Sequence, residues 1–342
     1  MNGLSRIRVA VLMGGRSSEH DISVVSARSV VAALDPARYD VREIEISREG
    51  RWSLPAASQP ELGSPAGSRL PVAANDYPEP FGEIDVVFPV LHGPFGEDGT
   101  VQGLLELAGV AYVGSGVTAS AVCMDKDIFK SVMRDKGIPV PASLTARRRY
   151  PSDVENPFGL PVVIKPARLG SSVGITIART PQELERGVEL AFEHDEKILL
   201  EEYVRGVEVE CSVLGNEEPI ASLPGEIVPL KADWYDFASK YDEDGMDLVV
   251  PPRIPAAAVA RVQELSVASF LASDCEGMAR VDCFVREDGE VLVNELNTIP
   301  GFTATSVYSK LFEASGIPYA ELLDRLIQLA LERRDRRANL RF

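Results

Sequence analysis

The chain has few of the features that mark secreted, zinc-binding or membrane proteins. Its 342 residues include four cysteines, which lie far apart and show no CxxC spacing. This pattern excludes a disulfide framework and a cysteine zinc site, and it fits a reduced cytoplasmic protein. The apolar run from Val9 to Met13 is too short for the core of a signal peptide, and no segment approaches transmembrane length. We therefore expect no membrane partner.

Positive charge is also scarce. Lysine and arginine together number 35 against 52 aspartates and glutamates, which gives a net charge of −17. Because an acidic surface repels a phosphate backbone, nucleic acid is not an expected partner. A phosphate-bearing ligand would have to be bound by a local cluster of cations.

The first 120 residues alternate between strand and helix patterns. The segments "IRVAVLM", "YDVREIEIS" and "IDVVFPVLHG" are typical of strands, whereas "ISVVSARSVVAAL" and "GTVQGLLELAG" have helical spacing. This order predicts a Rossmann-like α/β domain over residues 1–120, with ligands at the carboxyl ends of its strands. A length of 342 residues predicts two or three domains, and the remaining α+β pattern divides into a central domain over 121–206 and a C-terminal domain over 207–342.

Two features of these later domains bear on the site. The segment "CMDKDIFKSVMRDKG" predicts one helix that ends at Gly137. A long irregular loop is expected from about Pro224 to Pro255, and it contains "WYDFASKYDEDG" with Lys240 and Tyr241. Loops of this length inside a compact domain are usually lids or binding loops.

The common phosphate-binding loops are absent. The segment "MGGRSSEHDIS" lacks GxGxxG, and no segment matches GxxxxGK[ST]. In their place, "VVIKPARLGSSVG" predicts a strand that ends at Lys165, followed by a loop with Gly170, Ser171, Ser172 and Gly174. Such a loop presents backbone N–H groups to phosphate oxygens while the lysine supplies charge. A plain β-hairpin turn is the alternative.

The segment "RVDCFVREDGEVLVNELNTIPG" predicts a hairpin with a two-residue turn at Asp288-Gly289. Partner numbers then sum to 577, so Asp282 faces Glu295. Asn297 lies on the same face, opposite Arg280, and Phe284 pairs with Val293. Facing carboxylates are destabilising unless something neutralises them. Carboxylates with an amide suit Mg²⁺ or Mn²⁺, and a solvated strand face is the alternative.

The remaining candidate residues give weaker signals. Glu201 ends a strand, and Glu208 and Glu210 follow a turn, where carboxylates can accept ribose hydroxyls. His92 lies at the Gly-rich end of a strand in "LHGPFGEDGT", and Glu19 lies in the loop after the first strand. Each of these residues alone is more often structural or solvated.

Taken in order, the motifs resemble one family over essentially the whole chain. "GGRSSEHDIS", "LHGPFGEDG", "MDK", "IKPARLGSSVG", "EEYVRGVE", "ASKY", "RVDCFV" and "VNELNTIPGFTATS" resemble D-alanine–D-alanine ligases, which are ATP-grasp carboxylate–amine ligases. The resemblance implies a cytoplasmic homodimer for peptidoglycan precursor synthesis. It also implies an ATP-grasp fold in which two α+β domains clasp ATP next to the Rossmann-like domain. Two D-alanines and ATP are then the expected substrates, and two Mg²⁺ (or Mn²⁺) ions the expected cofactors.

The resemblance also implies roles for residues at the nucleotide. The predicted metal ligands are Asp282, Glu295 and Asn297. The predicted ATP contacts are Lys126, Lys165, Gly170, Ser171 and Ser172 at the phosphates, Glu201, Tyr203 and Val204 at the adenine, and Glu208 at the ribose. Position 203 is Tyr where other relatives carry Trp, and Asn294 stands where some relatives have an apolar residue.

A second set of implied roles concerns the amino acids. Glu19, with His92 nearby, is predicted to receive the ammonium of the first D-alanine. The carboxylate of the second D-alanine is assigned to Ser306 and Val307, and the oxyanion contacts to Arg280 and the Gly301 N–H. Ser171 and Tyr241 are expected to tie the phosphate loop to the lid, with Lys240 beside them.

Two alternatives stay open at this point. One is a D-alanine–D-lactate or D-alanine–D-serine ligase, which shares the same motifs. The other is a nucleotide-binding regulatory protein without turnover. The segment 53–80, rich in Pro, Ser, Ala and Gly, has no role that the sequence indicates.

Overall fold

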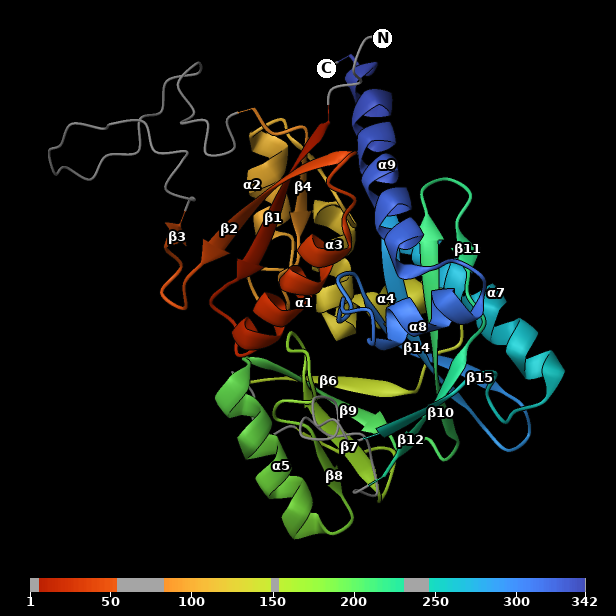
Figure 1. The fold of residues 1–342 in the computed structure, drawn as a ribbon. Helices are drawn as coiled ribbons and strands as arrows, with labels where there is room; N and C mark the ends of the chain where they lie inside the picture. The colour runs from red at the N-terminus through yellow and green to blue at the C-terminus, as the bar shows by residue number, and fades with distance from the viewer. Residues whose placement is uncertain (1–5, 54–82, 149–153, 231–245, 342) are drawn as a thin grey trace, which may run out of the picture.

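The computed structural model describes residues 6–53, 83–148, 154–230 and 246–341. Three β-sheets organise this part of the chain (Figure 1). Within it, no helix is both long enough and apolar enough to cross a membrane. The division of the chain into domains at residues 120 and 206 stays a prediction.

The N-terminal sheet has the order β3-β2-β1-β4-β5, and its strands are parallel except for β3 at one edge. Its strands are β1 (Ile7–Gly14), β2 (Tyr39–Ile46), β3 (Trp52–Ser53), β4 (Val86–Pro89) and β5 (Ala111–Tyr112). Its helices are α1 (His20–Ala33) and α2 (Thr100–Leu107). Central β1 is apolar and largely buried, as expected for a parallel strand that is covered on both faces. The predicted Rossmann-like arrangement is confirmed.

The second sheet is antiparallel, has the order β6-β9-β7-β8 and forms the lower part of Figure 1. Its elements are β6 (Ser143–Arg147), β7 (Val162–Pro166), β8 (Thr176–Ala178), β9 (Lys197–Glu202) and α5 (Pro181–His194). Thr180 caps α5 by accepting from the N–H of Glu183, and Pro181 occupies its first turn. We call this unit the lid sheet.

The third sheet has the order β13-β12-β10-β14-β15, with β11 attached to β10. Its strands are β10 (Val207–Gly215), β11 (Ile220–Ala221), β12 (Gly225–Pro229), β13 (Met246–Val249), β14 (Gly277–Val285) and β15 (Val291–Asn297). The associated helices are α3 (Val117–Met124), α4 (Lys126–Asp135), α7 (Ala256–Ala272), α8 (Val307–Ala314) and α9 (Tyr319–Ala338).

Two predictions of local structure are corrected here. The expected single helix is two helices, because Asp125 adopts an extended conformation and its carboxylate caps α4 by accepting from the N–H of Ile128. The expected irregular loop from Pro224 to Pro255 contains paired strands β12 and β13 at its two ends. Residues 231–245, with Lys240 and Tyr241, lie outside the described part of the chain.

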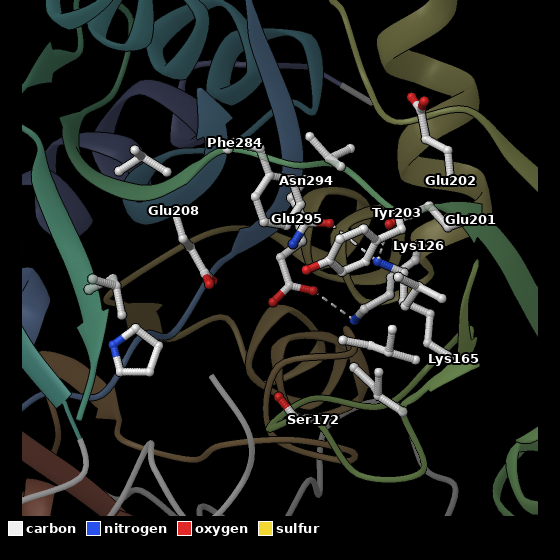
Figure 2. A pocket seen from close by; sticks show the side chains of 18 of the residues that line it. Lys126, Lys165, Ser172, Glu201, Glu202, Tyr203, Glu208, Phe284, Asn294 and Glu295 are labelled. Carbon is white, nitrogen blue, oxygen red and sulfur yellow. Dashed lines mark hydrogen bonds and ion pairs between the residues drawn. The ribbon is translucent and has the colours of Figure 1, made fainter. Parts of the chain in front are cut away.

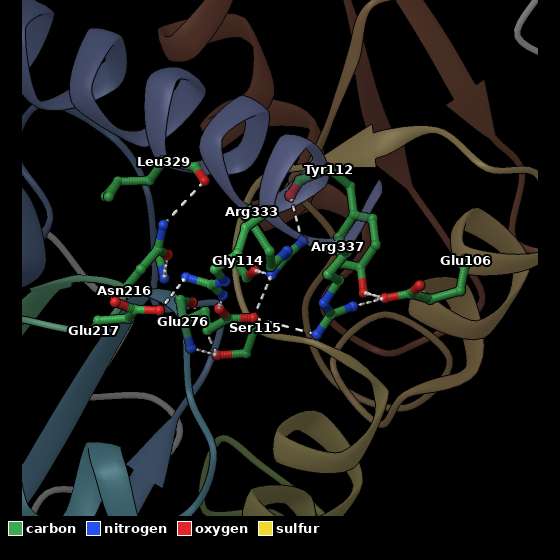
Figure 3. A network of polar contacts seen from close by, with 12 residues as sticks. Glu106, Tyr112, Gly114, Ser115, Asn216, Glu217, Glu276, Leu329, Arg333 and Arg337 are labelled. Carbon is green, nitrogen blue, oxygen red and sulfur yellow. Dashed lines mark hydrogen bonds and ion pairs between the residues drawn. The ribbon is translucent and has the colours of Figure 1, made fainter. Parts of the chain in front are cut away.

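Helix α9 joins the N-terminal and C-terminal sheets. Its leucines enter an apolar core that also contains β1, β4 and Met278 of β14. Near its end, the guanidinium of Arg333 is 3% exposed, donates to the carbonyl oxygens of Tyr112 (2.6 Å) and Gly114, and lies 4.3 Å from the Tyr112 ring centroid (Figure 3). Glu276, just before β14, pairs with Arg337 at 3.3 Å. These contacts fix the N-terminal sheet against the sheet that carries the predicted metal ligands.

Candidate active site

A cleft of about 370 Å³ lies between the lid sheet and the C-terminal sheet. Apolar residues of both sheets line it, including Val163 and Ile177 on one side and Phe284 on the other. The predicted ATP contacts converge on this cleft, and Figure 2 shows Lys126, Lys165, Tyr203, Glu208 and Glu295 around it. Apolar walls with a few charged groups at one end suit a flat base that bears phosphates.

A second cavity, of about 730 Å³, adjoins the first and is also lined by charged residues of both signs. The N-terminal domain contributes Glu19 and His92, and the C-terminal segments contribute Arg280, Asn297, Gly301, Ser306 and Val307. The two cavities share the residues Lys126, Gly170, Ser171 and Glu295. A group bound at the end of the first cavity therefore lies against the second.

Two lysines enter the cleft from different elements. Lys126 begins α4, and its Nζ lies 3.1 Å from Oε2 of Glu295 and donates to the Leu169 carbonyl oxygen at 2.9 Å. Burial lowers the pKa of Lys126, but the Glu295 carboxylate more than offsets this, so the net pKa is raised. Lys165 lies near the end of β7, and its Nζ donates to Oδ1 of Asn294 at 3.2 Å. The Lys126 ammonium is therefore held as a cation at the cleft, and Lys165 enters beside it.

Glu201 lies at the centre of a buried charge cluster. Its carboxylate is 2.8 Å from the Nζ of Lys165 and 2.8 Å from that of Lys130, and the residue is 2% exposed. Burial raises the pKa of Glu201, but the two lysines hold it below the ordinary value. The predicted adenine-contacting carboxylate is thus ionised. Lys130, which completes the cluster, was not among the predicted site residues.

The hairpin of β14 and β15 differs from its predicted form at two points. The turn is a three-residue loop rather than a two-residue one: Arg286 N–H donates to the Glu290 carbonyl oxygen at 2.9 Å, and Gly289 has φ +87°. Phe284 therefore pairs with Leu292, and Val293 pairs with Cys283 in the core, so the predicted Phe284–Val293 pair is wrong.

A bulge then restores the predicted pairing at the site. The register shifts between Asp282 and Cys283, which leaves Asn294 as the extra residue of β15, and Asp282 faces Glu295 as expected. Because the bulge adds one residue, Asn294 and Glu295 both line the nucleotide cleft, where alternation along a regular strand would turn one of them away. This is how Asn294 reaches Lys165.

Three carboxylates lie side by side across adjacent strands, in the order Glu210, Asp282 and Glu295. The Nε of Arg280 lies 2.9 Å from Glu210 and 2.7 Å from Asp282. In the described ranges, no three carboxylate, imidazole or thiol groups form a metal cluster. The predicted ligand set is different, since it has two carboxylates and the Asn297 amide. These hard oxygen donors fit Mg²⁺ or Mn²⁺ with further oxygens from a phosphate.

The loop from Gly170 to Gly174 connects the cavities. Ser171 (φ +52°) and Ser172 (φ +58°) both adopt the left-handed conformation, which is uncommon for residues other than glycine and marks a constrained, often functional turn. At Gly174 a Cβ atom would lie 2.9 Å from the Pro166 side chain, so this position requires glycine. The Ser171 hydroxyl donates to Oε1 of Glu19. The predicted phosphate loop therefore contacts the wall of the second cavity that Glu19 and His92 form.

That wall contains one carboxyl group that the sequence analysis missed. Glu97 lines the second cavity with Glu19 and His92, and its Oε1 accepts from the Gly93 N–H at 2.8 Å. Burial, together with the Glu19 charge, raises the pKa of Glu97 to about 8. Burial also lowers the pKa of His92, whose Nδ1 is 2.9 Å from the Ile299 carbonyl oxygen. At neutral pH the imidazole is therefore neutral and Glu97 is protonated.

The opposite wall is the start of α8. Ser306 is its N-cap residue, and its Oγ accepts from the Thr303 N–H at 3.0 Å. A Cβ at Gly301 would lie 3.4 Å from that Oγ, which shows how closely the two predicted contacts approach each other. A helix N-terminus presents N–H groups and a partial positive charge, both of which suit a carboxylate.

Three residues of the site, Glu97, Lys130 and Asn294, were not among the predicted site residues. The sequence indicates them to different degrees. Glu97 stands in the quoted motif "LHGPFGEDGT", so its carboxyl was visible but its burial was not. Lys130 lies one turn after Lys126 on α4, which placed it within reach. The bulge at Asn294 leaves no signature in composition or alternation.

The lid sheet and C-terminal sheet, closed over a cleft with lysines and facing carboxylates, define an ATP-grasp fold. Family models described as "D-ala D-ala ligase N-terminus" and "D-ala D-ala ligase C-terminus" match residues 8–115 and 132–328. The chain belongs to the D-alanine–D-alanine ligase family.

Individual relatives agree with this assignment. A D-alanine–D-alanine ligase of Solibacter usitatus is 47% identical, over 98% of this chain and 99% of that protein. The VanG D-Ala:D-Ser ligase of Enterococcus faecalis has a TM-score of 0.82 at 36% identity, over 95% of this chain and 100% of that one. A Bacillus anthracis D-alanine–D-alanine ligase complexed with ATP has a TM-score of 0.76 at 30% identity, over 97% and 99% of the two chains.

Proposed function

We propose that this chain is an ATP-dependent ligase that joins two D-alanines into D-alanyl-D-alanine, with release of ADP and phosphate. The observation that carries the proposal is the junction of the two cavities at Lys126, Gly170, Ser171 and Glu295. A γ-phosphate at this junction lies against the carboxylate of an amino acid in the second cavity. The name of the 47% identical relative supports D-alanine as that amino acid.

The nucleotide roles follow from the cleft. Lys126 and Lys165 contact the phosphates, and the Gly170–Gly174 loop closes over them. The segment after β9, with Tyr203 and Val204, lies along the adenine, and Glu208 accepts the ribose hydroxyls. The structure of the Bacillus anthracis relative complexed with ATP supports ATP as the ligand.

The metal site is assigned to Asp282, Glu295 and Asn297. Bound Mg²⁺ or Mn²⁺ supplies charge stabilisation to the phosphoryl group in transfer. The carboxylate row on β10, β14 and β15 supports the assignment, since it concentrates negative charge beside Lys126 and Arg280.

The chemistry proceeds in two steps. A carboxylate is a poor acyl donor, so the first D-alanine, held through its ammonium by Glu19 with His92 nearby, is phosphorylated to an acyl phosphate. The amine of the second D-alanine then attacks the acyl carbon. Arg280 and the Gly301 N–H stabilise the oxyanion. Because an acyl phosphate hydrolyses in water, the loop and lid must exclude solvent during the reaction.

The second D-alanine is assigned to the start of α8, with its carboxylate at Ser306 and Val307. The proposal also keeps Lys240 and Tyr241 as lid residues near Ser171. A D-serine acceptor is the second candidate, because the VanG D-Ala:D-Ser ligase shares this fold at 36% identity. D-lactate and a regulatory protein without turnover are the further alternatives.

One experiment separates these candidates. Purified protein with ATP and Mg²⁺ is offered D-alanine, D-serine and D-lactate together, and the products are identified by mass. We expect D-alanyl-D-alanine and ADP. A mixed dipeptide or an ester as the main product would change the acceptor, and nucleotide binding without product would favour the regulatory protein.

We also propose a cytoplasmic homodimer that supplies a peptidoglycan precursor. Family membership supports this proposal, and the four cysteines are free and buried, as in a reducing compartment. Sedimentation equilibrium of the purified chain at several concentrations tests the dimer.

A further inference from the structure

Lys130 is a buried lysine to which the proposed reaction gives no role. It lies on α4, is 0% exposed, and its Nζ is 2.8 Å from Oε2 of Glu201. It does not line the nucleotide cleft, whereas Glu201 and Lys165 do. Burying an ammonium group costs about several kcal/mol of desolvation free energy, which an ionic partner then offsets. Such a group needs a physical reason beyond filling space.

The reason lies in how Glu201 is shared. Its other oxygen, Oε1, is 2.8 Å from the Nζ of Lys165, so one carboxylate lies between two ammonium groups. The three charges sum to +1. With Lys165 as its only partner, Glu201 would cancel the charge of the lysine that faces the cleft. The second lysine, on the side away from the cleft, removes that cancellation.

We propose that Lys130 is a positioning residue for the nucleotide, which neutralises Glu201 from behind and leaves the Lys165 charge available to a phosphate. It also fixes the Glu201 carboxylate at the edge of the cleft. This inference rests on the proposed function, because it takes ATP as the occupant of the cleft.

The titration of Lys130 supports the geometry. Burial lowers its pKa to about 8, Glu201 acts to raise it, and Lys165 and Arg134 act to lower it further. The group is therefore charged below about pH 8 and neutral above it. Since a bound polyanion favours the charged form, ATP binding near pH 8 takes up protons. ATP affinity should fall as the pH rises through 8.

The substitution Lys130→Met tests the proposal. Methionine has a similar volume and leaves Glu201 and Lys165 as a balanced pair, so the fold should be retained. We expect ATP, with Mg²⁺, to bind about 10- to 100-fold more weakly at pH 7, because Glu201 would then cancel the Lys165 charge that faces the cleft. The KM for D-alanine should stay within about twofold. Lys136→Met is the matched control, since Lys136 follows the same helix and its side chain is 56% exposed.

Calorimetry in buffers of different ionisation enthalpy gives an independent readout. The parent should take up a fraction of a proton when ATP binds at pH 8, and Lys130→Met should take up less. A purely structural lysine would not change this proton count. If Lys130→Met does not fold, Lys130→Gln takes its place in both measurements, and an ATP affinity and a proton uptake equal to those of the parent overturn the proposal.

Different results would overturn the proposed function and the role of Lys130. A parent protein that binds no ATP, or makes no ligation product, overturns the proposed function. A parent that is active, beside a folded Lys130→Met with unchanged ATP affinity and proton uptake, overturns only the role of Lys130. In a Glu201→Gln background the effect of Lys130→Met should shrink, because the charge through which it acts is gone.

Discussion

The Ser171 hydroxyl donates a hydrogen bond to the Glu19 carboxylate, although 152 residues separate the two in the chain. This bond joins the Gly170–Gly174 loop, the predicted phosphate loop, to the wall of the second cavity, where the first amino acid is proposed to bind. It would link closure of that loop to the organisation of the cavity.

We expect Ser171→Ala to lower kcat/KM for D-alanine by about 10- to 100-fold, because a hydrogen bond to a charged group contributes about 1.5–3 kcal/mol. ATP affinity should change much less, since the loop backbone is retained. Steady-state kinetics with each substrate varied in turn measures both. Ser131→Ala, which removes a hydroxyl bonded to a carbonyl oxygen of its own helix, is the control. An equal loss for both substrates would contradict the assigned link.

Glu295→Gln should abolish turnover, with a loss of at least about 100-fold, while the fold stays intact. Opposite Asp282, a neutral amide removes like-charge repulsion, although Lys126 loses its partner at 3.1 Å. Thermal melts with and without Mg²⁺ and ATP measure the consequence. The increase in Tm on adding both ligands should shrink, since stabilisation by a ligand follows its affinity for the native state. A large loss of stability without ligands would make Glu295 structural.

Because of Glu97, we expect the free energy of unfolding to depend on pH. Its pKa is raised to about 8 in the fold, so the folded carboxyl stays protonated while the unfolded one ionises above about pH 4.5. Its contribution is therefore fully present below pH 4.5 and is lost as the pH rises towards 8. A tenfold difference in proton affinity between the folded and unfolded carboxyl corresponds to about 1.4 kcal/mol of unfolding free energy.

Glu97→Gln should remove this loss of stability. In urea denaturation, the free energy of unfolding of the variant should therefore rise relative to that of the parent by a few kcal/mol between pH 5 and 8. The paired substitution Glu106→Gln, at a half-exposed carboxylate on α2, should show no such trend. A parallel pH dependence for parent and Glu97→Gln would mean that Glu97 is ionised in the fold.

We expect the protein to lose stability when Arg333, at the junction of the N-terminal and C-terminal sheets, is substituted. Arg333→Met leaves the Tyr112 and Gly114 carbonyl oxygens without this buried donor, and we expect about 2–4 kcal/mol lower free energy of unfolding. Arg334→Met, at a side chain 43% exposed, should cost no more than about 0.5 kcal/mol. Urea denaturation of both variants at one pH gives the comparison. Equal values would show that the network in Figure 3 does not hold the sheets together.

Local patterns in the sequence predicted much of the order of elements, and the resemblance of its motifs to one family implied most of the candidate site. Apolar runs and helical spacing predicted β1, β2, β4, α1 and α2, because local periodicity reports which face of an element is buried. Of the predicted site residues from Glu19 to Val307 that the structure describes, all but Asp282 line two adjoining cavities, and Asp282 lies beside Glu295 on the neighbouring strand. Chemistry-bearing residues at the ends of elements are visible in sequence because their position along the chain indicates where they lie.

Which of these groups are charged, buried and in contact depends on the tertiary structure and could not be predicted from local patterns. The bulge at Asn294 depends on how β15 pairs with β14, and the shared carboxylate depends on α4 packing behind β9. Likewise, the Glu97 carboxyl is neutral because of groups brought to it by other segments. Desolvation and charge sharing are sums over neighbours distant in the chain, so periodicity and motif order, which are local, carry no record of them.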